Sequence, residues 1–238
     1  MTKKKKGKNK KQLPESGTDI ALPETGKQKK KKGKGAQKAY HNSRHLLIFS
    51  VEEQLKHGKM VSNLAYEVAK ELKLPDEQCI NLAIAGFFHD IGKTELNPET
   101  FSGKASLVVE EMNSVRMHPM KGYEILKRHN FDEEICEDVL FHHENYDGSG
   151  YPDNLAGKDI PVGACILRVC DVFCALVSDR PYRKAYSPEK AMELMTEDMK
   201  DFDLHVFLAF QRVMHKSEDG SLRMPEVSDT VKGVWKSL

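Results

Sequence analysis

Two neighbouring pairs of residues have the types and placement of metal ligands. His142 and His143 stand together in HHENYDGSGYP, at residues 142–152, directly before a Gly-rich turn. His89 and Asp90 stand together in AIAGFFHDIGK, where an apolar helical run ends at a glycine. Neighbouring residues on a helix point about 100° apart, so His89 and Asp90 can face one pocket rather than each other. Asp90 has two oxygens and can bridge two ions.

A histidine and a glutamate share one helical face near residue 55. His57 falls on the same side as Val61 and Leu64, and Glu53 lies one turn before it. At this spacing two side chains can bind one ion. A lone inward histidine is more commonly a hydrogen-bonded core residue, but His57 is not the only such residue in this chain.

Two further polar residues occupy unusual positions. Asp171 lies in ACILRVCDVFCALVSD, where apolar residues surround it, and a buried carboxylate needs a cation. Arg168, one turn earlier, is one candidate partner, and a metal ion is the other. His118 precedes Pro119 and therefore lies at a break between two helical stretches.

Together these side chains suggest a cluster of metals rather than a single ion. Imidazoles and carboxylates without a thiolate favour iron, manganese or catalytic zinc over a structural zinc site. The number of ligands predicts two or three divalent ions, roughly 3.5 to 4 Å apart, which lower the pKa of a bound water from about 15.7 toward 7. The resulting hydroxide could attack a phosphoester. The candidate ligands are Glu53, His57, His89, Asp90, His118, His142, His143 and Asp171.

Three basic residues are candidates for contact with a phosphate. Lys93, one turn past His89, could stabilise developing negative charge, or could simply complete a helix C-terminus. Arg180 and Arg183, in DRPYR, could contact phosphate or guanine through their planar forks, or could form surface ion pairs.

The elements that would position these residues are all helices. Apolar residues recur at intervals of three and four from residue 51 onward, and no period-2 segment is present. The sequence predicts an all-α fold. After the first helix, which ends before Leu74-Pro75-Asp76, we expect helices at about 77–90, 106–128, 132–143, 161–179, 187–199 and 203–216.

The charge distribution separates a tail from a body. Residues 1–40 contain 14 lysines and three acidic residues, a net charge of +11, whereas the remainder carries −10. The tail has too little apolar area to bury, so we expect it to be disordered. Its lysines could bind nucleic acid or an anionic membrane, or could serve only to keep the protein soluble. The LPETG stretch within it lacks the following apolar segment of a sorting signal. The predicted domains are a tail at 1–40, a catalytic body at 41–218 and a C-terminal extension at 219–238.

Five cysteines without a CxxC pair lie in apolar runs, which favours a reducing, cytoplasmic compartment. No apolar segment follows the N-terminal lysines, and none approaches the length of a transmembrane helix. The oligomeric state is not predicted.

The motifs resemble those of the HD-GYP family, a branch of the HD-domain phosphohydrolases. The resemblance covers about residues 50–210 and rests on EEQLKH, HDIGK, MHPMKGYEIL, HHENYDGSGYP and ILRVCDVFCALVSDRPYRKA. It implies an HD-domain helical bundle and hydrolysis of cyclic di-GMP to pGpG and possibly GMP, with iron or manganese as cofactor.

The resemblance also implies roles for individual residues. The eight candidate ligands would bind the metals, Asp90 as the bridge and Glu53 at a third ion. Tyr151 would face the nucleotide, and Lys93, Arg180 and Arg183 would meet phosphates or guanine. Asn145 departs from the family, which usually has a basic residue there, and residues 94–106 also differ. The alternatives are an HD hydrolase of another nucleotide and a non-catalytic module that senses a nucleotide.

Overall fold

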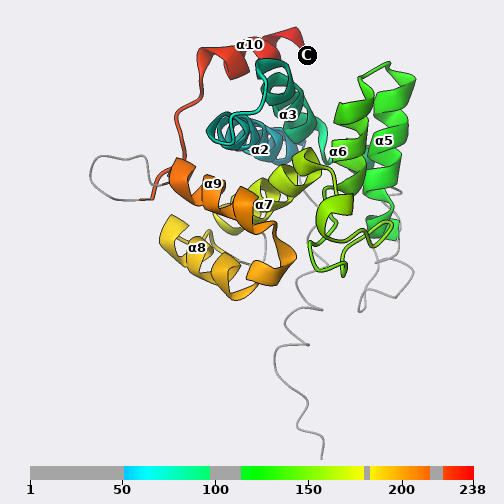
Figure 1. The fold of residues 1–238 in the computed structure, drawn as a ribbon. Helices are drawn as coiled ribbons and strands as arrows, with labels where there is room; N and C mark the ends of the chain where they lie inside the picture. The colour runs from blue at the N-terminus through cyan, green and yellow to red at the C-terminus, as the bar shows by residue number, and fades with distance from the viewer. Residues whose placement is uncertain (1–50, 97–113, 180–182, 215–221) are drawn as a thin grey trace, which may run out of the picture. The chain divides into compact units, whose positions relative to one another are not determined.

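The computed structural model describes residues 51–96, 114–179, 183–214 and 222–238 (Figure 1). Within these ranges the regular structure is helical and no strand forms, which confirms the all-α prediction. The predicted tail and Arg180 lie outside the described residues. The helices are α2 (Val51–Glu71), α3 (Asp76–Phe88), α5 (His118–Arg128), α6 (Glu133–Phe141), α7 (Val162–Leu176), α8 (Pro188–Glu197), α9 (Leu204–Met214) and α10 (Asp229–Ser237), with short 3₁₀ turns η1 (Ile91–Glu95), η3 (Gly157–Asp159) and η4 (Met199–Asp201).

Helix α7 is central because it contacts α2, α3, α6, α8 and α9 (Figure 1). It is apolar on most sides, and Ile166, Leu167 and Phe173 are fully buried in it. Removing such side chains from water is the main favourable contribution to folding. The position of α7 also carries Asp171 into the middle of the bundle.

The last helix, α10, was not among those predicted. It lies against α2 and α3, where the Trp235 indole donates a hydrogen bond to Ser62 Oγ at 3.0 Å and the Lys59 ammonium lies 5.4 Å from the centre of the indole ring. A helix of nine residues is marginal on its own, so the stability of α10 depends on this tertiary contact. The predicted domain boundaries stay predictions.

All five cysteines are buried and unpaired, as expected for small apolar residues. Within the described residues, no helix is both long and apolar enough to cross a membrane.

Asp138 is a buried carboxyl group that links α6 to α7. It is 3% exposed, and it accepts a hydrogen bond from the Ala164 N–H in the first turn of α7. Burial raises the pKa of Asp138 well above its ordinary value, and neighbouring Glu134 adds to the effect. The neutral form is therefore favoured in the folded state.

This predicts a pH-dependent stability difference between the wild type and Asp138→Asn. Because the folded pKa is raised, the contribution of Asp138 to stability is fully present below its unfolded pKa, about 4, and is lost as pH rises through the folded pKa. Asparagine stays neutral, so the variant should gain stability relative to the wild type between pH 5 and pH 8, as measured by urea unfolding. A wild type that gains stability over the variant with rising pH would contradict this assignment.

Candidate active site

A close crossing of α2 and α3 brings the first two imidazoles together. A Cβ atom on Gly58 would lie 2.7 Å from the Phe87 carbonyl oxygen, so the two backbones can approach this closely only without a side chain there. The crossing places the rings of His57 and His89 edge to face, with centroids 5.2 Å apart.

A second close approach joins η1 to the start of α5. A Cβ atom on Gly92 would lie 2.0 Å from the His118 carbonyl oxygen and 2.5 Å from the Gly122 nitrogen. Gly92 therefore lets α5 lie directly on the turn that follows Asp90. As a result His118 Nε2 lies 3.3 Å from Asp90 Oδ1.

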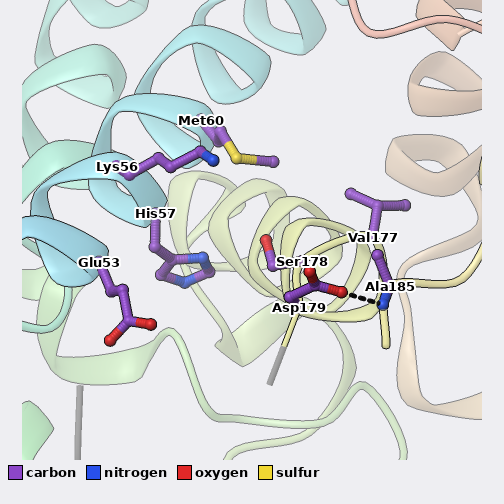
Figure 2. Close-up of a pocket in the computed structure, with 8 residues that line it drawn as sticks. All are labelled: Glu53, Lys56, His57, Met60, Val177, Ser178, Asp179 and Ala185. Carbon is purple, nitrogen blue, oxygen red and sulfur yellow. Dashed lines mark hydrogen bonds between the residues drawn. The ribbon is translucent and has the colours of Figure 1, made fainter. Parts of the chain in front are cut away.

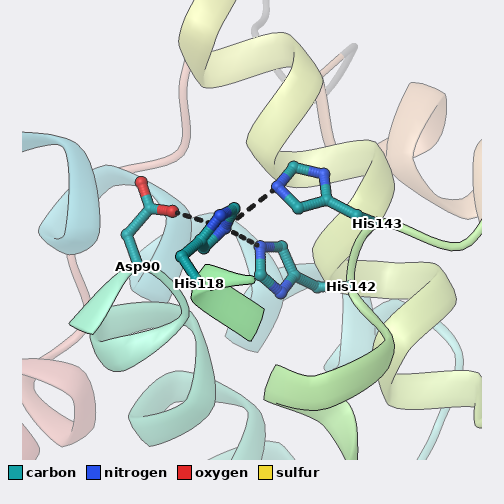
Figure 3. Close-up of side chains that lie close together, drawn as sticks. All are labelled: Asp90, His118, His142 and His143. Carbon is teal, nitrogen blue, oxygen red and sulfur yellow. Dashed lines mark hydrogen bonds and ion pairs between the residues drawn. The ribbon is translucent and has the colours of Figure 1, made fainter. Parts of the chain in front are cut away.

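Three imidazoles and one carboxylate converge at this point (Figure 3). His118 Nε2 lies 3.2 Å from His143 Nε2 and 3.4 Å from His142 Nε2. One ligand atom from each of Asp90, His118, His142 and His143 lies within 4.8 Å of all the others. We call these four residues the first ligand group.

The orientation of the rings shows that the group fits a cation. The Nδ1 atoms of His118 and His142 lie 2.7 Å and 2.6 Å from the carbonyl oxygens of Val115 and Val139. A carbonyl can only accept, so both Nδ1 atoms carry hydrogens, and in the neutral rings both Nε2 atoms carry lone pairs. Two lone pairs that face each other at 3.4 Å repel, and a metal ion between the imidazoles would relieve that repulsion.

His57, His89 and Asp90 form a second ligand group around the same carboxylate. His89 Nδ1 donates to the Gly86 carbonyl at 2.8 Å, so its Nε2 also faces the site. That Nε2 is buried, and it lies 3.4 Å from Asp90 Oδ2 and 3.6 Å from Asp171 Oδ1, too far for good hydrogen bonds. Asp90 thus belongs to both groups, as its predicted bridging role requires.

Asp171 joins the second group and is not paired with Arg168. Its Oδ1 lies 2.9 Å from His57 Nε2, whereas Arg168 Nε donates to Asn145 Oδ1 at 3.0 Å. Of the two partners considered for Asp171, the geometry therefore favours a metal bound with the neighbouring histidines.

The charge states also suit metal binding. Burial lowers the pKa values of His57 and His143, and it lowers the pKa of His142 to about 3, with neighbouring imidazoles contributing. Burial opposes ionisation of Asp90, but Lys93 and nearby imidazoles hold its pKa well below the ordinary value. Burial opposes protonation of His89, but the carboxylates of Asp90 and Asp171 raise its pKa to about 10, so a bound metal would have to displace a proton from this ring. The site therefore presents an ionised carboxylate with neutral imidazoles at His57, His142 and His143, which are the forms that bind metals.

Glu53 and Lys93 line the same cavity as the ligand groups. This metal cavity has a volume of about 180 Å³, and its lining includes Glu53, His57, Asp90, Lys93 and Asp171. Lys93 Nζ lies 2.5 Å from Asp90 Oδ2. Glu53 is exposed in the first turn of α2 and belongs to neither close ligand group.

A second cavity adjoins the metal cavity on the side of His57 and has a volume of about 380 Å³ (Figure 2). Glu53 and His57 line both cavities. The second cavity extends from α2 to the end of α7, where Asp179 accepts a hydrogen bond from the Ala185 N–H at 2.8 Å.

Tyr151 covers His143 at the edge of the metal cavity. Its ring stacks on the imidazole with centroids 4.8 Å apart and planes inclined by 22°. The Arg116 guanidinium lies 5.0 Å from the centre of the tyrosine ring. Glu144, which is 2% exposed, accepts a hydrogen bond from the Asp153 N–H at 2.7 Å and so holds the loop in place.

Arg116 and Glu144 also lie at the site, although neither was predicted from the sequence to do so. Glu144 directly follows the histidine pair, and that position was an available signal. No local pattern distinguishes Arg116, because its contact is with the ring of Tyr151, which is distant in the sequence.

Arg183 is engaged with the end of α7. Its guanidinium donates to the carbonyl oxygens of Leu176 and Ala175, each at 2.9 Å, and lies 4.3 Å from the centre of the Tyr186 ring. These bonds satisfy carbonyl groups that a helix C-terminus leaves unpaired. The predicted substrate contacts of Arg183 and Arg180 stay predictions.

The fold and motifs agree with known proteins. A protein-family model described as an HD domain matches residues 41–206. The chain belongs to the HD domain family. Its HHE and GYP motifs place it in the HD-GYP branch, as the sequence predicted. The solved structure of Bd1817, an HDG"Y"P protein from Bdellovibrio bacteriovorus, superposes with a TM-score of 0.54 and 21% identity, covering 67% of this chain and 52% of that one.

Two curated relatives have names that state an activity. Cyclic di-GMP phosphodiesterase PA4108 of Pseudomonas aeruginosa is 36% identical over 159 residues, which are 66% of this chain and 38% of that protein. The 3′3′-cGAMP-specific phosphodiesterase 3 of Vibrio cholerae is 29% identical over 174 residues, 73% of this chain and 38% of that protein. The chain thus spans well under half of each relative's length.

Proposed function

We propose that this HD-GYP protein is a metal-dependent phosphodiesterase that opens cyclic di-GMP to pGpG and can continue to GMP. The observation that carries the proposal is the convergence of the two ligand groups on Asp90. They lie at the metal cavity, which shares Glu53 and His57 with the second cavity. The relatives named as cyclic di-GMP and 3′3′-cGAMP phosphodiesterases support the substrate class.

Two or three divalent ions, iron or manganese, would supply a water of lowered pKa and would neutralise charge on the phosphoryl group. The first group would hold one ion and the second group, with Asp171, another. Glu53 would bind a third ion, since its position beside His57 lets it turn toward the metal cavity. Iron and manganese suit these ligands equally.

The remaining residues would bind and orient the substrate. Hydrolysis adds water to one phosphodiester phosphorus as its bond to the ribose 3′ oxygen breaks, and that oxygen takes up a proton. Lys93 lies where its ammonium can stabilise negative charge on the phosphoryl oxygens. Tyr151, stacked on His143, would form one wall against the nucleotide.

Hydrolysis of cyclic dinucleotides by the metal-loaded chain tests this function. The anaerobically purified protein should contain two or three metal ions per chain and should convert cyclic di-GMP to pGpG, with activity lost on chelation and restored by manganese or iron. If the protein hydrolysed 3′3′-cGAMP faster than cyclic di-GMP, the substrate would be a different cyclic dinucleotide, and the reaction would be the same. Binding without turnover in the metal-replete protein would instead indicate a sensing module.

Residues 1–40 lie outside the described part of the chain. Contact of this tail with nucleic acid or an anionic membrane therefore stays a prediction from its charge of +11.

A further inference from the structure

A third cavity lies beside the metal site, between α7 and α8, and has a volume of about 490 Å³. We call it the α8-side cavity. It shares His143, Asp171 and Ala175 with the metal cavity. A nucleoside attached to a phosphate at the ligand groups could therefore enter it. Its other lining residues are Arg168, Val172, Leu176, Arg183, Tyr186, Leu194, Met195, Asp198, Asp201 and Phe202.

The walls of this cavity suit a flat, partly apolar ring. Leu176 and Val172 come from α7, Met195 comes from α8, and Phe202 follows η4. Apolar walls with a few directed polar groups are typical of small-molecule sites. The polar groups therefore determine which base is bound.

Arg168 presents a donor fork that the described part of the protein does not occupy. Its Nε donates to Asn145 Oδ1 at 3.0 Å, which fixes the side chain, and no carboxylate among the described residues lies within ion-pair distance of it. The two Nη atoms are thus left to donate elsewhere. Asn145 is one of the two places at which the sequence departs from its family.

Asp201 presents a carboxylate to the same cavity. Among the described residues it accepts no hydrogen bond, and the nearest cation is Lys200 Nζ, 3.6 Å from Oδ1. Its backbone is held, because its carbonyl accepts a hydrogen bond from the Tyr146 N–H at 3.0 Å. Tyr146 directly follows Asn145, so Asp201 is tied to the segment that also holds Arg168.

This pair of groups matches guanine better than adenine. Guanine offers two acceptors, O6 and N7, to which arginine donates as a fork, and two adjacent donors, N1–H and the exocyclic amine, for a carboxylate. Adenine carries an acceptor at N1, which would face the carboxylate lone pairs and repel them. We propose that the α8-side cavity binds a guanine base of the substrate, with Arg168 donating to O6 and N7 and Asp201 accepting from N1–H and the amine. This inference rests on the proposed function and specifies its base.

The test compares cyclic di-GMP, 3′3′-cGAMP and cyclic di-AMP as substrates of the full, manganese-loaded chain. The wild type should prefer the substrates that contain guanine. Asp201→Asn keeps the side-chain shape but replaces one carboxylate oxygen with an amide NH₂ group, which cannot accept a hydrogen bond from guanine. It should lower kcat/KM for cyclic di-GMP by about tenfold to a hundredfold, the range of a bidentate base contact. Its kcat/KM for cyclic di-AMP should change less than about twofold.

Two further variants keep the result interpretable. Arg168→Gln should reduce the preference for guanine in the same direction. Glu197→Gln removes an exposed charge at the end of α8, outside the cavity lining, and should leave all three rates unchanged. If Asp201→Asn acted only through the structure, it would lower kcat/KM equally for all three substrates, and this result would overturn the assignment. A wild type with equal kcat/KM for cyclic di-AMP and cyclic di-GMP would also overturn it. Failure of the wild type to cleave any cyclic dinucleotide would instead refute the proposed function.

Discussion

Replacing Asp90 with alanine is expected to abolish hydrolysis and to lower the metal content of the purified chain. Asp90 Oδ1 lies 3.3 Å from His118 Nε2, and Oδ2 lies 3.4 Å from His89 Nε2, so one carboxylate serves both ligand groups. Without it, the first group keeps only imidazoles, and the second keeps Asp171 as its one carboxylate. We expect kcat to fall by about 10³-fold, the upper range for loss of one electrostatic stabiliser, and bound metal to fall by at least one ion per chain.

The variant also leaves the Lys93 ammonium, which is 9% exposed, without its carboxylate partner. Breaking a buried ion pair costs about 3–5 kcal/mol, so the unfolding temperature must be measured beside activity. Asp90→Asn keeps the side-chain volume and separates loss of charge from loss of packing. Asp159→Ala, at an exposed position in η3, is the control and should behave as the wild type. Full activity and metal content in Asp90→Ala would refute the bridging role.

Gly92→Ala is expected to disrupt the site without changing any ligand. The added methyl group would lie 2.0 Å from the His118 carbonyl oxygen and 2.5 Å from the Gly122 nitrogen, and backbone atoms cannot rotate away as a side chain can. Helix α5 must therefore shift away from η1 and carry His118 with it. A displacement of about 1 Å at a catalytic group can cost about 10²-fold in rate, and we expect a loss of at least that size.

Metal analysis and thermal unfolding of Gly92→Ala should show weaker metal binding and a destabilisation of about 1–3 kcal/mol from overpacking. The matched control is Gly233→Ala on α10, where an added Cβ meets nothing within 4 Å. It should leave activity unchanged and raise stability by no more than about 1 kcal/mol, because alanine is favoured over glycine inside a helix. If Gly92→Ala and Gly233→Ala retain equal activity, the contact between η1 and α5 does not determine the position of His118.

The helices and the ligand types follow from local rules. Apolar residues at intervals of three and four predicted α2, α3, α6, α7, α8 and α9. His89 and His142 follow the last residues of their helices, as the stop signals in the sequence indicated. Short-range patterns suffice here because helix periodicity and termination depend on residues close together in the chain.

The grouping of the ligands depends on contacts far apart in sequence. Nothing local indicated that His57 would lie beside Asp171, 114 residues away, or that the ligands would divide into two groups around Asp90. Those distances depend on how closely the helices cross at Gly58 and Gly92.

Several side chains also had two plausible partners in the sequence. Arg168 was a candidate for Asp171, which lies one turn away, but it bonds Asn145 in a different element. Arg183 was a candidate for contact with phosphate or guanine, which stays a prediction, and its guanidinium bonds the carbonyl groups at the end of α7. Residue type and spacing determine what a side chain can bind, whereas the packing of neighbouring helices determines which partner lies within reach, because long side chains adopt the rotamer that the surrounding atoms allow.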